Sequence, residues 1–362
     1  MLVISDLGYG GAERQVVALA NGLGSLGIES FVATLSAHTP LADQLKNADC
    51  LHVVGRSPFR LARLLKDLNI DVVHGFLLDA EILSRLAARL SGGVRVIGSE
   101  RSTRHNYTWW QRGLYKLTGK VMSRCIANTQ EGAQWHARTF GLPVNRYQIV
   151  RNGVDTIRFA PGEAAEIRQK LGVSSTDFLI GMFASFKPVK NHTLLIEALA
   201  LLNERGIFCK VLLVGDRMQR GRHAHSGLVA RIETQIRDLH LENQVIMIGH
   251  QVDIERLYRA CTLTVLPSDY EGTPNVVIES MACGIPAVVS DVTGNREAIV
   301  EGEGGVLFTA GSSEALTEAL ERLLKDPIRL ATMQNTARAV AINRFGLARM
   351  LEEMASAYRS LP

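Results

Sequence analysis

Short apolar runs alternate with helical patterns along the whole chain, and this alternation constrains the fold more than any other feature. Each run is short enough for a buried parallel strand, and each helical pattern between two runs can serve as a crossover helix. The predicted strands cover residues 2–5, 30–35, 51–54, 71–74, 94–97, 125–127 and 148–150, and then 179–183, 211–214, 245–248, 263–266, 287–289 and 306–308. The pattern predicts an α/β protein with two parallel sheets that carry helices on both faces.

Length and composition are those of an ordinary globular protein with two or three domains. The chain has 362 residues, of which 46% are apolar and 21% charged, and its net charge of +4 is too small to indicate nucleic acid binding. No run approaches the roughly 18 apolar residues of a membrane span, and no signal segment opens the chain. The five cysteines are scattered without metal-ligand spacing, which favours reduced thiols in a cytoplasmic protein.

The most informative stretch covers residues 267–290, where a strand end, a loop, a short helix and a new strand follow one another. Thr273 is suited to the N-cap, so we expect a helix over residues 274–283. Glu271 lies in the loop and Glu279 on the helix. Loops at the carboxyl ends of the strands form the ligand site of an open α/β sheet, so both carboxylates can face one ligand.

The start of this helix predicts an anionic ligand, because the first N–H groups of a helix lack partners within it and carry its positive dipole end. Two carboxylates beside an anion site indicate sugar hydroxyls, since a carboxylate accepts charge-assisted hydrogen bonds from a pair of hydroxyl groups. A sugar joined to phosphate groups satisfies both expectations.

The segment Glu271-Gly-Thr-Pro-Asn-Val-Val-Ile-Glu279, followed by Ser-Met-Ala-Cys-Gly-Ile-Pro, resembles the E-x7-E signature of glycosyltransferase family 4. The resemblance covers nearly the whole chain and is most specific in the second half. It implies the GT-B fold, in which two Rossmann-like parallel-sheet domains face each other across a cleft. The expected parts are an acceptor-binding domain over residues 1–160, a nucleotide-sugar donor domain over 161–345, and a C-terminal helix over 346–362 that packs back on the first domain.

The resemblance also implies a reaction. We expect a retaining hexosyltransferase that moves a sugar from a UDP- or GDP-linked donor to a glycan or polyprenyl-linked acceptor, in the biosynthesis of a capsule, exopolysaccharide or lipopolysaccharide. The donor is a substrate, and no cofactor is expected. The sequence contains no Asp-x-Asp motif, so we expect no metal held in that manner. Members of the family have a few residues before the first strand, which places the expected start of the protein upstream of Met1.

The residues that contact the donor are carried over from the family position by position. Lys190 matches the lysine that meets the pyrophosphate, Ser185 stands where the family has an arginine, and Lys187 supplies that charge from a shifted position. Glu271 is expected to hold hydroxyls of the donor sugar, and Glu279 the ribose diol. The full set comprises Gly10, Gly11, Ser185, Lys187, Lys190, His250, Glu271, Gly272, Thr273, Pro274, Asn275, Val276, Glu279, Gly294 and Asn295.

Three residues are expected to take part in catalysis: Glu271, Lys190 and His74. Lys190 and the backbone N–H groups of the glycine turn after the first strand would stabilise the leaving diphosphate. His74 ends the predicted strand 71–74, where a histidine serves as a general base, as a hydrogen-bonding group or as a structural residue. The family commonly has a second histidine two positions later, where this chain has Phe76.

Residues 101–124 hold six basic residues and no acids, interleaved with aromatic residues that include Trp109, Trp110 and Tyr115. A basic segment with aromatic anchors is typical of a protein that lies on an anionic membrane surface or binds a phosphorylated acceptor. A solvated helix face whose apolar side enters the core is an equally good interpretation. The first interpretation predicts a cytoplasmic protein with peripheral contact to the inner face of the cell membrane.

Other function classes stay open. A nucleotide-sugar-binding partner subunit without transfer activity is suggested by Ser185 and Phe76, and it would bind a donor without forming product. A nucleotide-sugar epimerase on the same fold would act on the donor without an acceptor, and a phosphorylase would consume free phosphate. We expect no nucleic acid partner.

Overall fold

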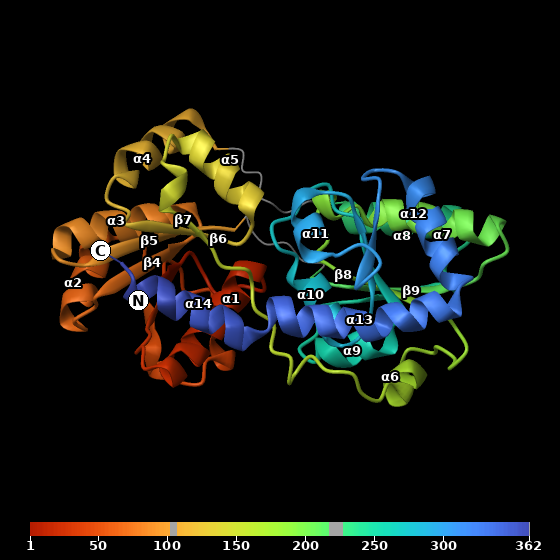
Figure 1. Ribbon diagram of the computed structural model, residues 1–362. Coiled ribbons are helices and arrows are strands. Elements are labelled where there is room, and N and C mark those ends of the chain that lie inside the picture. The colour runs from red at the N-terminus through yellow and green to blue at the C-terminus, as the bar shows by residue number, and fades with distance from the viewer. Residues whose placement is uncertain (102–106, 217–226, 362) are drawn as a thin grey trace. The chain divides into compact units, whose positions relative to one another are not determined.

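The structure, a computed structural model, describes residues 1–101, 107–216 and 227–361 of the chain (Figure 1). The chain divides into two compact units. Unit 1 consists of Met1–Gly153 and Leu347–Pro362, and unit 2 consists of Val154–Gly346. The border between the units therefore follows Gly153 rather than residue 160, and the last helix belongs to the unit that holds the N-terminal half.

The described part of unit 1 contains a seven-stranded parallel sheet with the strand order β3-β2-β1-β4-β5-β6-β7. Its strands are β1 (Leu2–Ile4), β2 (Val32–Thr34), β3 (Leu51–Val53), β4 (Val72–Phe76), β5 (Arg95–Glu100), β6 (Arg124–Ala127) and β7 (Tyr147–Ile149). Its helices are α1 (Gly11–Gly22), α2 (Pro58–Asp67), α3 (Leu78–Ser91), α4 (Trp109–Gly119), α5 (Gln130–Phe140) and α14 (Leu347–Arg359).

Both faces of this sheet are covered, so its strands β1 and β2 are buried at every position. Leu2 and Ile4 of β1 enter a core that includes buried residues of α1 and α14, whereas Val3 enters a second core with α2 and α3. Successive side chains of a strand point to opposite faces, so one short strand supplies both cores.

The described part of unit 2 contains a six-stranded parallel sheet with the order β10-β9-β8-β11-β12-β13. Its strands are β8 (Leu179–Phe183), β9 (Lys210–Val214), β10 (Val245–Ile248), β11 (Leu263–Leu266), β12 (Ala287–Ser290) and β13 (Gly305–Phe308). Its helices are α6 (Ala165–Lys170), α7 (His192–Glu204), α8 (Leu228–Asp238), α9 (Ile254–Ala260), α10 (Asn275–Ala282), α11 (Thr293–Ala298), α12 (Ser313–Leu324) and α13 (Pro327–Phe345).

The strand order of each sheet reverses once. In unit 1, β1 lies between β2 and β4, and in unit 2, β8 lies between β9 and β11. Crossover connections leave in opposite directions from such a point, which opens a crevice at the carboxyl ends of the two neighbouring strands. In unit 2 the loops that follow β8 and β11 meet there.

The predicted α/β class with two parallel sheets is confirmed, and each predicted strand lies on an observed strand. Two local predictions are wrong. Strand β4 continues to Phe76, because Phe76 still pairs with Ile4 of β1. Helix α10 begins at Asn275 with Pro274 as its N-cap, because Pro274 is extended (φ −75°, ψ 104°) and its carbonyl accepts from Val277 N at 3.1 Å. Thr273 is therefore not the cap.

The five cysteines are buried and form no disulfide. Within residues 1–101, 107–216 and 227–361, no helix combines the length and the apolar character that crossing a membrane requires. The same residues contain no cluster of three or more histidine, cysteine, aspartate or glutamate side chains that could hold a metal ion.

Candidate functional site

An ion pair joins the two loops at the switch point of unit 2. Lys190 lies in the 3-10 turn Pro188–Lys190 that follows β8, and Glu271 lies in the loop that follows β11. Lys190 Nζ donates to Glu271 Oε1 at 2.5 Å, and both side chains are partly exposed. The structure therefore brings together two residues that the sequence separates by 81 positions.

Asn191 fixes this arrangement. It adopts the left-handed conformation (φ 50°, ψ 49°) at the start of α7, where asparagine is tolerated better than most residues. Its Nδ2 donates to Pro267 O at 3.1 Å and to Asp269 Oδ1 at 2.5 Å. The Asp269 N–H in turn donates to Val189 O at 2.9 Å. The two loops are thus tied together by main-chain and side-chain bonds on either side of Lys190.

Glu279 lies on α10 and is only 6% exposed. The hydroxyl of Tyr258 on α9 donates to Glu279 Oε2 at 3.0 Å, and Tyr258 itself is fully buried against Phe183 of β8. A buried carboxylate needs hydrogen-bond donors to replace the water that it loses and to fix its orientation. Tyr258 supplies one such donor, and it was not identified from the sequence, because nothing local links α9 to α10.

The first turn of α10 faces the same loop. The side chain of Pro274 accepts no hydrogen bond from the first turn of α10. The N–H groups of this turn therefore need other acceptors. Asn275 is partly exposed and both Thr273 and Asn275 make further contacts. This is the arrangement in which a helix end takes an anion.

Gly294 and Asn295 shape the site through the backbone. A Cβ on Gly294 would lie 1.5 Å from Gly272 O, so α11 approaches the 271–272 backbone as closely as only glycine allows. Asn295 is fully buried and its Nδ2 donates to Ser290 O at 2.8 Å, at the end of β12. Gly294 therefore positions the Glu271 loop, and Asn295 holds the backbone at the end of β12.

The remaining predicted residues of unit 2 follow strands β8 and β10 or lie on α10. Ser185 is partly exposed after β8, and its carbonyl accepts from Lys187 N at 2.7 Å. Lys187 is exposed and makes no ion pair with any described residue, so its charge is available to a ligand. His250 is partly exposed just after β10, and Val276 is partly exposed on the first turn of α10.

The glycine turn of unit 1 leads into α1. Gly10 is the N-cap of α1 with an extended conformation (φ −94°, ψ 169°), and Gly11 is exposed at the first helical position. A Cβ on Gly10 would lie 2.0 Å from Glu13 Oε2, so the Glu13 carboxylate folds back over the start of the helix. Acidic groups are favoured at that end of a helix.

His74 does not end its strand, which corrects the position predicted for it. It lies in the middle of β4 and is 1% exposed. One ring nitrogen, Nε2, lies 2.9 Å from Ser99 Oγ, and the other, Nδ1, lies 2.8 Å from Tyr358 OH on α14. Burial, with the nearby Arg101 charge, holds the pKa of His74 well below its usual range. This environment favours a neutral, structural histidine that joins β4, β5 and α14.

A second buried polar cluster fastens α4 to the core of unit 1. Arg85 Nη2 and Tyr115 OH both donate to Glu81 Oε2 at 2.5 Å. Burial raises the pKa of Glu81 to about 7, against the lowering effects of Arg85 and the Tyr115 hydrogen bond. Because Tyr115 belongs to α4, this cluster sets which face of α4 is turned inward.

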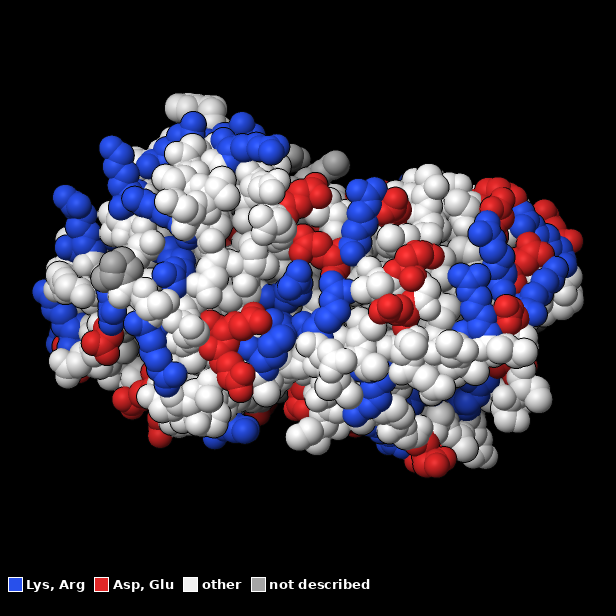
Figure 2. Space-filling model, in the orientation of Figure 1, with Lys and Arg blue, Asp and Glu red and all other residues white. Residues whose placement is uncertain are grey.

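The opposite face of α4 is exposed. Trp109 is 86% exposed, Leu117 is 75% exposed, and Trp110 is exposed beside them. Arg112, Lys116 and Lys120 are also exposed on or just after this helix. Figure 2 shows basic side chains gathered on the part of unit 1 that carries α4. The face therefore combines large apolar side chains with positive charge.

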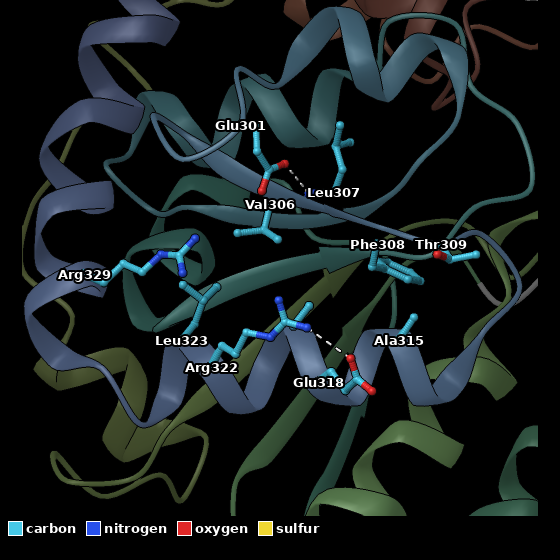
Figure 3. Close-up of a pocket in the computed structure, with 11 residues that line it drawn as sticks. Glu301, Val306, Leu307, Phe308, Thr309, Ala315, Glu318, Arg322, Leu323 and Arg329 are labelled. Atoms are coloured by element: carbon cyan, nitrogen blue, oxygen red, sulfur yellow. Dashed lines mark hydrogen bonds and ion pairs between the residues drawn. The ribbon is translucent and has the colours of Figure 1, made fainter.

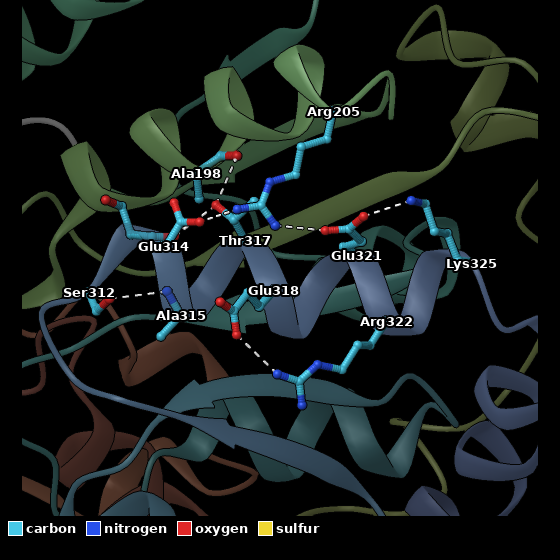
Figure 4. A network of polar contacts seen from close by, with 11 residues as sticks. Ala198, Arg205, Ser312, Glu314, Ala315, Thr317, Glu318, Glu321, Arg322 and Lys325 are labelled. Carbon is cyan, nitrogen blue, oxygen red and sulfur yellow. Dashed lines mark hydrogen bonds and ion pairs between the residues drawn. The ribbon is translucent and has the colours of Figure 1, made fainter.

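A pocket of about 230 Å³ lies elsewhere on unit 2, between β13 and α12 (Figure 3). None of the predicted site residues lines it. Glu301 accepts from Leu307 N at 2.9 Å, which satisfies a donor on the outer edge of the sheet. Figure 4 shows why α12 is firmly held there: Arg205, which follows α7, pairs with Glu314 and Glu321 of α12. These contacts indicate that Glu301 and the charged residues of α12 have structural roles.

Comparison with known proteins covers both units. Residues 163–340 match the family model of Glycosyl transferases group 1, and residues 9–158 match that of Glycosyltransferase Family 4. The putative glycosyltransferase EpsD of Bacillus subtilis (strain 168) is 30% identical, over 84% of this chain and 83% of its own length. The UDP-Gal:alpha-D-GlcNAc-diphosphoundecaprenol alpha-1,3-galactosyltransferase of Escherichia coli is 25% identical, over 91% of this chain and 82% of its own.

Solved structures share the fold. The crystal structure of Anabaena Alr3699/HepE in complex with UDP-glucose superposes with a TM-score of 0.87 at 24% identity, covering 100% of both chains. The apo form of the lipopolysaccharide outer core galactosyltransferase WaaB superposes with a TM-score of 0.73 at 18% identity, covering 99% of both chains. Both units of the chain thus have counterparts in one known two-domain fold.

Proposed function

Because this chain belongs to glycosyltransferase family 4, we propose that it is a retaining transferase that moves a sugar from a nucleoside diphosphate sugar to a hydroxyl of a lipid-linked or glycan acceptor. The observation that carries the proposal is the Lys190–Glu271 pair at the switch point of unit 2. It sets a cation and a carboxylate side by side, as a ligand with both phosphate and hydroxyl groups requires.

The donor is held by unit 2 in this proposal. Lys190 binds the diphosphate as a point charge, Lys187 adds a second positive charge, and the start of α10 takes a phosphate oxygen. Glu271 accepts from hydroxyls of the sugar once Lys190 turns to the diphosphate. Glu279 accepts from the ribose diol, in an orientation held by Tyr258.

UDP is the nucleotide best supported among the candidate donors. The Escherichia coli relative is named for a UDP-galactose donor, and Alr3699/HepE was solved with UDP-glucose. The same relative is named for a diphosphoundecaprenol-linked acceptor, which supports a lipid-linked acceptor and a place in the assembly of a cell-surface polysaccharide.

Catalysis rests on stabilising the leaving diphosphate. Negative charge develops on the diphosphate as the bond to the sugar breaks, and donors fixed beforehand favour that state. Lys190, Lys187 and the helix end of α10 supply these donors. The sequence has no Asp-x-Asp motif, so the proposal includes no cation held in that manner.

Retention of the anomeric configuration follows from front-face attack, in which the acceptor hydroxyl enters from the side that the diphosphate leaves. A double displacement would require a carboxylate nucleophile at the anomeric carbon. Glu271 is engaged with Lys190 and Glu279 with Tyr258, and both are assigned to hydroxyl groups. The departing phosphate can instead accept the proton of the attacking hydroxyl.

The exposed face of α4 supports a finer proposal, that unit 1 binds an anionic membrane surface through Trp109, Trp110, Leu117 and the three basic residues beside them. Tryptophan suits the boundary between headgroups and acyl chains, and each basic residue contributes about 1 kcal/mol near an anionic lipid surface. A lipid-linked acceptor would be met at that surface.

A transfer assay tests the proposal. The protein is incubated with UDP-glucose, UDP-galactose, UDP-N-acetylglucosamine or GDP-mannose and with short-chain prenyl-diphosphate-linked sugars, and the product is analysed by NMR. We expect one donor to give product with its anomeric configuration retained. Donor binding without product from any acceptor would support a silent partner subunit, and an altered donor without acceptor would indicate an epimerase.

A further inference from the structure

Arg101 follows β5 directly, at the carboxyl edge of the unit 1 sheet, and neutral groups hold its guanidinium in place. Nε donates to Ser99 Oγ at 3.2 Å, and Nη1 donates to Asn152 Oδ1 at 3.1 Å. The guanidinium carbon lies 5.1 Å from the ring centroid of Phe76, at the end of β4. A guanidinium has about five N–H donors. These two bonds leave others unused, and Nη2 has no partner among the described residues.

The charge of Arg101 is not balanced by an ion pair to any described residue. The neighbouring carboxylates have other partners: Glu100 Oε2 lies 3.3 Å from His136 Nε2, and Glu81 is bound by Arg85 and Tyr115. Residues 102–106 read Ser-Thr-Arg-His-Asn and contain no acid. A partly buried cation without an ion pair costs free energy: burial lowers the pKa of Arg101 to about 10, although the charges of Glu100 and Glu81 act to raise it. A ligand that brings negative charge would remove this cost.

The start of α1 lies at the same corner of the sheet. Asn152, which holds Arg101, precedes Gly153, and Gly153 exchanges two hydrogen bonds of 3.0 Å with the side chain of Gln15 on α1. Phe76, under the guanidinium, pairs with Ile4 of β1, the strand that leads into α1. Asn152 and Phe76 therefore connect Arg101 with Gln15 of α1 and with the strand that leads into this helix.

We propose that Arg101 binds a phosphoryl group, with the planar guanidinium donating to two of its oxygens. The proposed function supplies one source of such a group, the diphosphate of a lipid-linked acceptor. The inference rests on the proposed function for this source alone, because the guanidinium without an ion pair is present whichever reaction the protein performs.

The test is calorimetric titration of inorganic pyrophosphate into the full chain, once without nucleotide and once with saturating UDP. The wild type is compared with Arg101→Gln and Arg101→Lys. The control is Arg95→Gln, because Arg95 lies at the opposite end of β5 from Arg101 and donates to Leu361 O. Melting curves confirm that each variant is folded.

We expect Arg101→Gln to weaken pyrophosphate binding about tenfold or more, and Arg95→Gln to leave it unchanged. A loss confined to the UDP-saturated protein, with UDP affinity unchanged, assigns Arg101 to the acceptor phosphates. A matching loss of UDP affinity would contradict the assignment to the acceptor phosphates.

Equal pyrophosphate and UDP affinities in wild type and Arg101→Gln would overturn the inference, whatever the transfer assay shows. If Arg101→Gln does not fold, Arg101→Lys decides, since it keeps the charge but loses the planar fork: weaker binding supports the inference and unchanged binding contradicts it. The protein could bind pyrophosphate through Arg101 and yet use no nucleotide sugar. That result would contradict the proposed function and support this inference.

Discussion

The hydroxyl of Tyr258 donates to Glu279 Oε2 at 3.0 Å within the core of unit 2, so the orientation of the Glu279 carboxylate depends on a residue 21 positions earlier. Tyr258→Phe keeps the ring that packs on Phe183 and removes this one donor. We expect the KM for the donor to rise about tenfold with little change in kcat, because a hydrogen bond to a charged group contributes roughly 1.5–3 kcal/mol.

A purely structural role of Tyr258 would not change nucleotide selectivity. In our account the wild type prefers UDP to 2′-deoxy-UDP because Glu279 binds the ribose diol, and Tyr258→Phe narrows that preference. Tyr270→Phe, at an exposed position of the neighbouring loop, should leave it unchanged. A Tyr258→Phe protein with the full wild-type preference would show that the hydroxyl does not position Glu279 for this purpose.

Gly294→Ala should destabilise unit 2 and weaken donor binding. The added Cβ would lie 1.5 Å from Gly272 O, a backbone atom that can move only with the Glu271 loop. We expect a loss of roughly 1–3 kcal/mol in unfolding free energy, as for other overpacked sites, measured by urea denaturation. Gly249→Ala has no atom within 4 Å of its new Cβ and serves as the control. Equal unfolding free energies of Gly294→Ala and Gly249→Ala would show that the Glu271 loop moves to accommodate the new Cβ without cost.

The stability of unit 1 should depend on pH through Glu81. Burial raises its pKa to about 7, above the value of an unfolded chain, so the folded state binds more protons than the unfolded state between about pH 4.5 and 7. The contribution of Glu81 to stability is therefore greatest below that window and is lost as the pH rises through it.

Glu81→Gln removes this titration. Melting temperatures at pH 5, 6, 7 and 8 should fall less steeply for Glu81→Gln than for the wild type, whereas Glu29→Gln, at an exposed position, should follow the wild type. Parallel curves for wild type and Glu81→Gln would show that Arg85 and Tyr115 keep Glu81 ionised throughout.

The exposed face of α4 should bind anionic lipid. In liposome flotation with phosphatidylglycerol vesicles at low salt, we expect the wild type to float and the double variant Arg112→Glu/Lys116→Glu to remain at the bottom. High salt should release the wild type, because screening shortens the range of the attraction.

A matched control separates the position of these charges from their number. Lys46→Glu/Arg329→Glu changes the net charge equally at exposed positions outside α4 and should float like the wild type. If the α4 variant floats like the wild type, the membrane interpretation of residues 101–124 is wrong and the solvated-helix interpretation is supported.

Strands such as β8 could be predicted from the sequence because they are compact apolar runs buried on both faces, and the predicted bounds 179–183 coincide with those of β8. The ends of other elements depend on partners that the local sequence does not name. The sequence predicts that a strand ends at His74, but pairing of Phe76 with Ile4 extends β4 past it. Likewise, the N-cap of α10 is Pro274 rather than the predicted Thr273, because Pro274 has an extended conformation.

Some residues of the candidate site could likewise be predicted from the sequence, and others could not. The sequence motifs around Glu271, Glu279 and Lys190 are specific enough to identify these residues. The structure shows that Lys190 and Glu271 are in contact. Tyr258 and Arg101 gain their importance from one distant contact each, with Glu279 and with Asn152. A tyrosine in a helix or an arginine after a strand carries no local signal of such a partner.

Nucleotide binding to wild type and to a Lys190→Ala variant is the measurement that tests the account most directly. The account predicts that UDP or another nucleoside diphosphate raises the melting temperature of the wild type, because a ligand that binds the folded state stabilises it by mass action. Lys190→Ala should lose most of this shift, and Lys170→Ala, at an exposed position on α6, should keep it. A folded wild type that no nucleotide stabilises, or a Lys190→Ala protein stabilised to the same extent, would contradict the assignment of the donor site to unit 2.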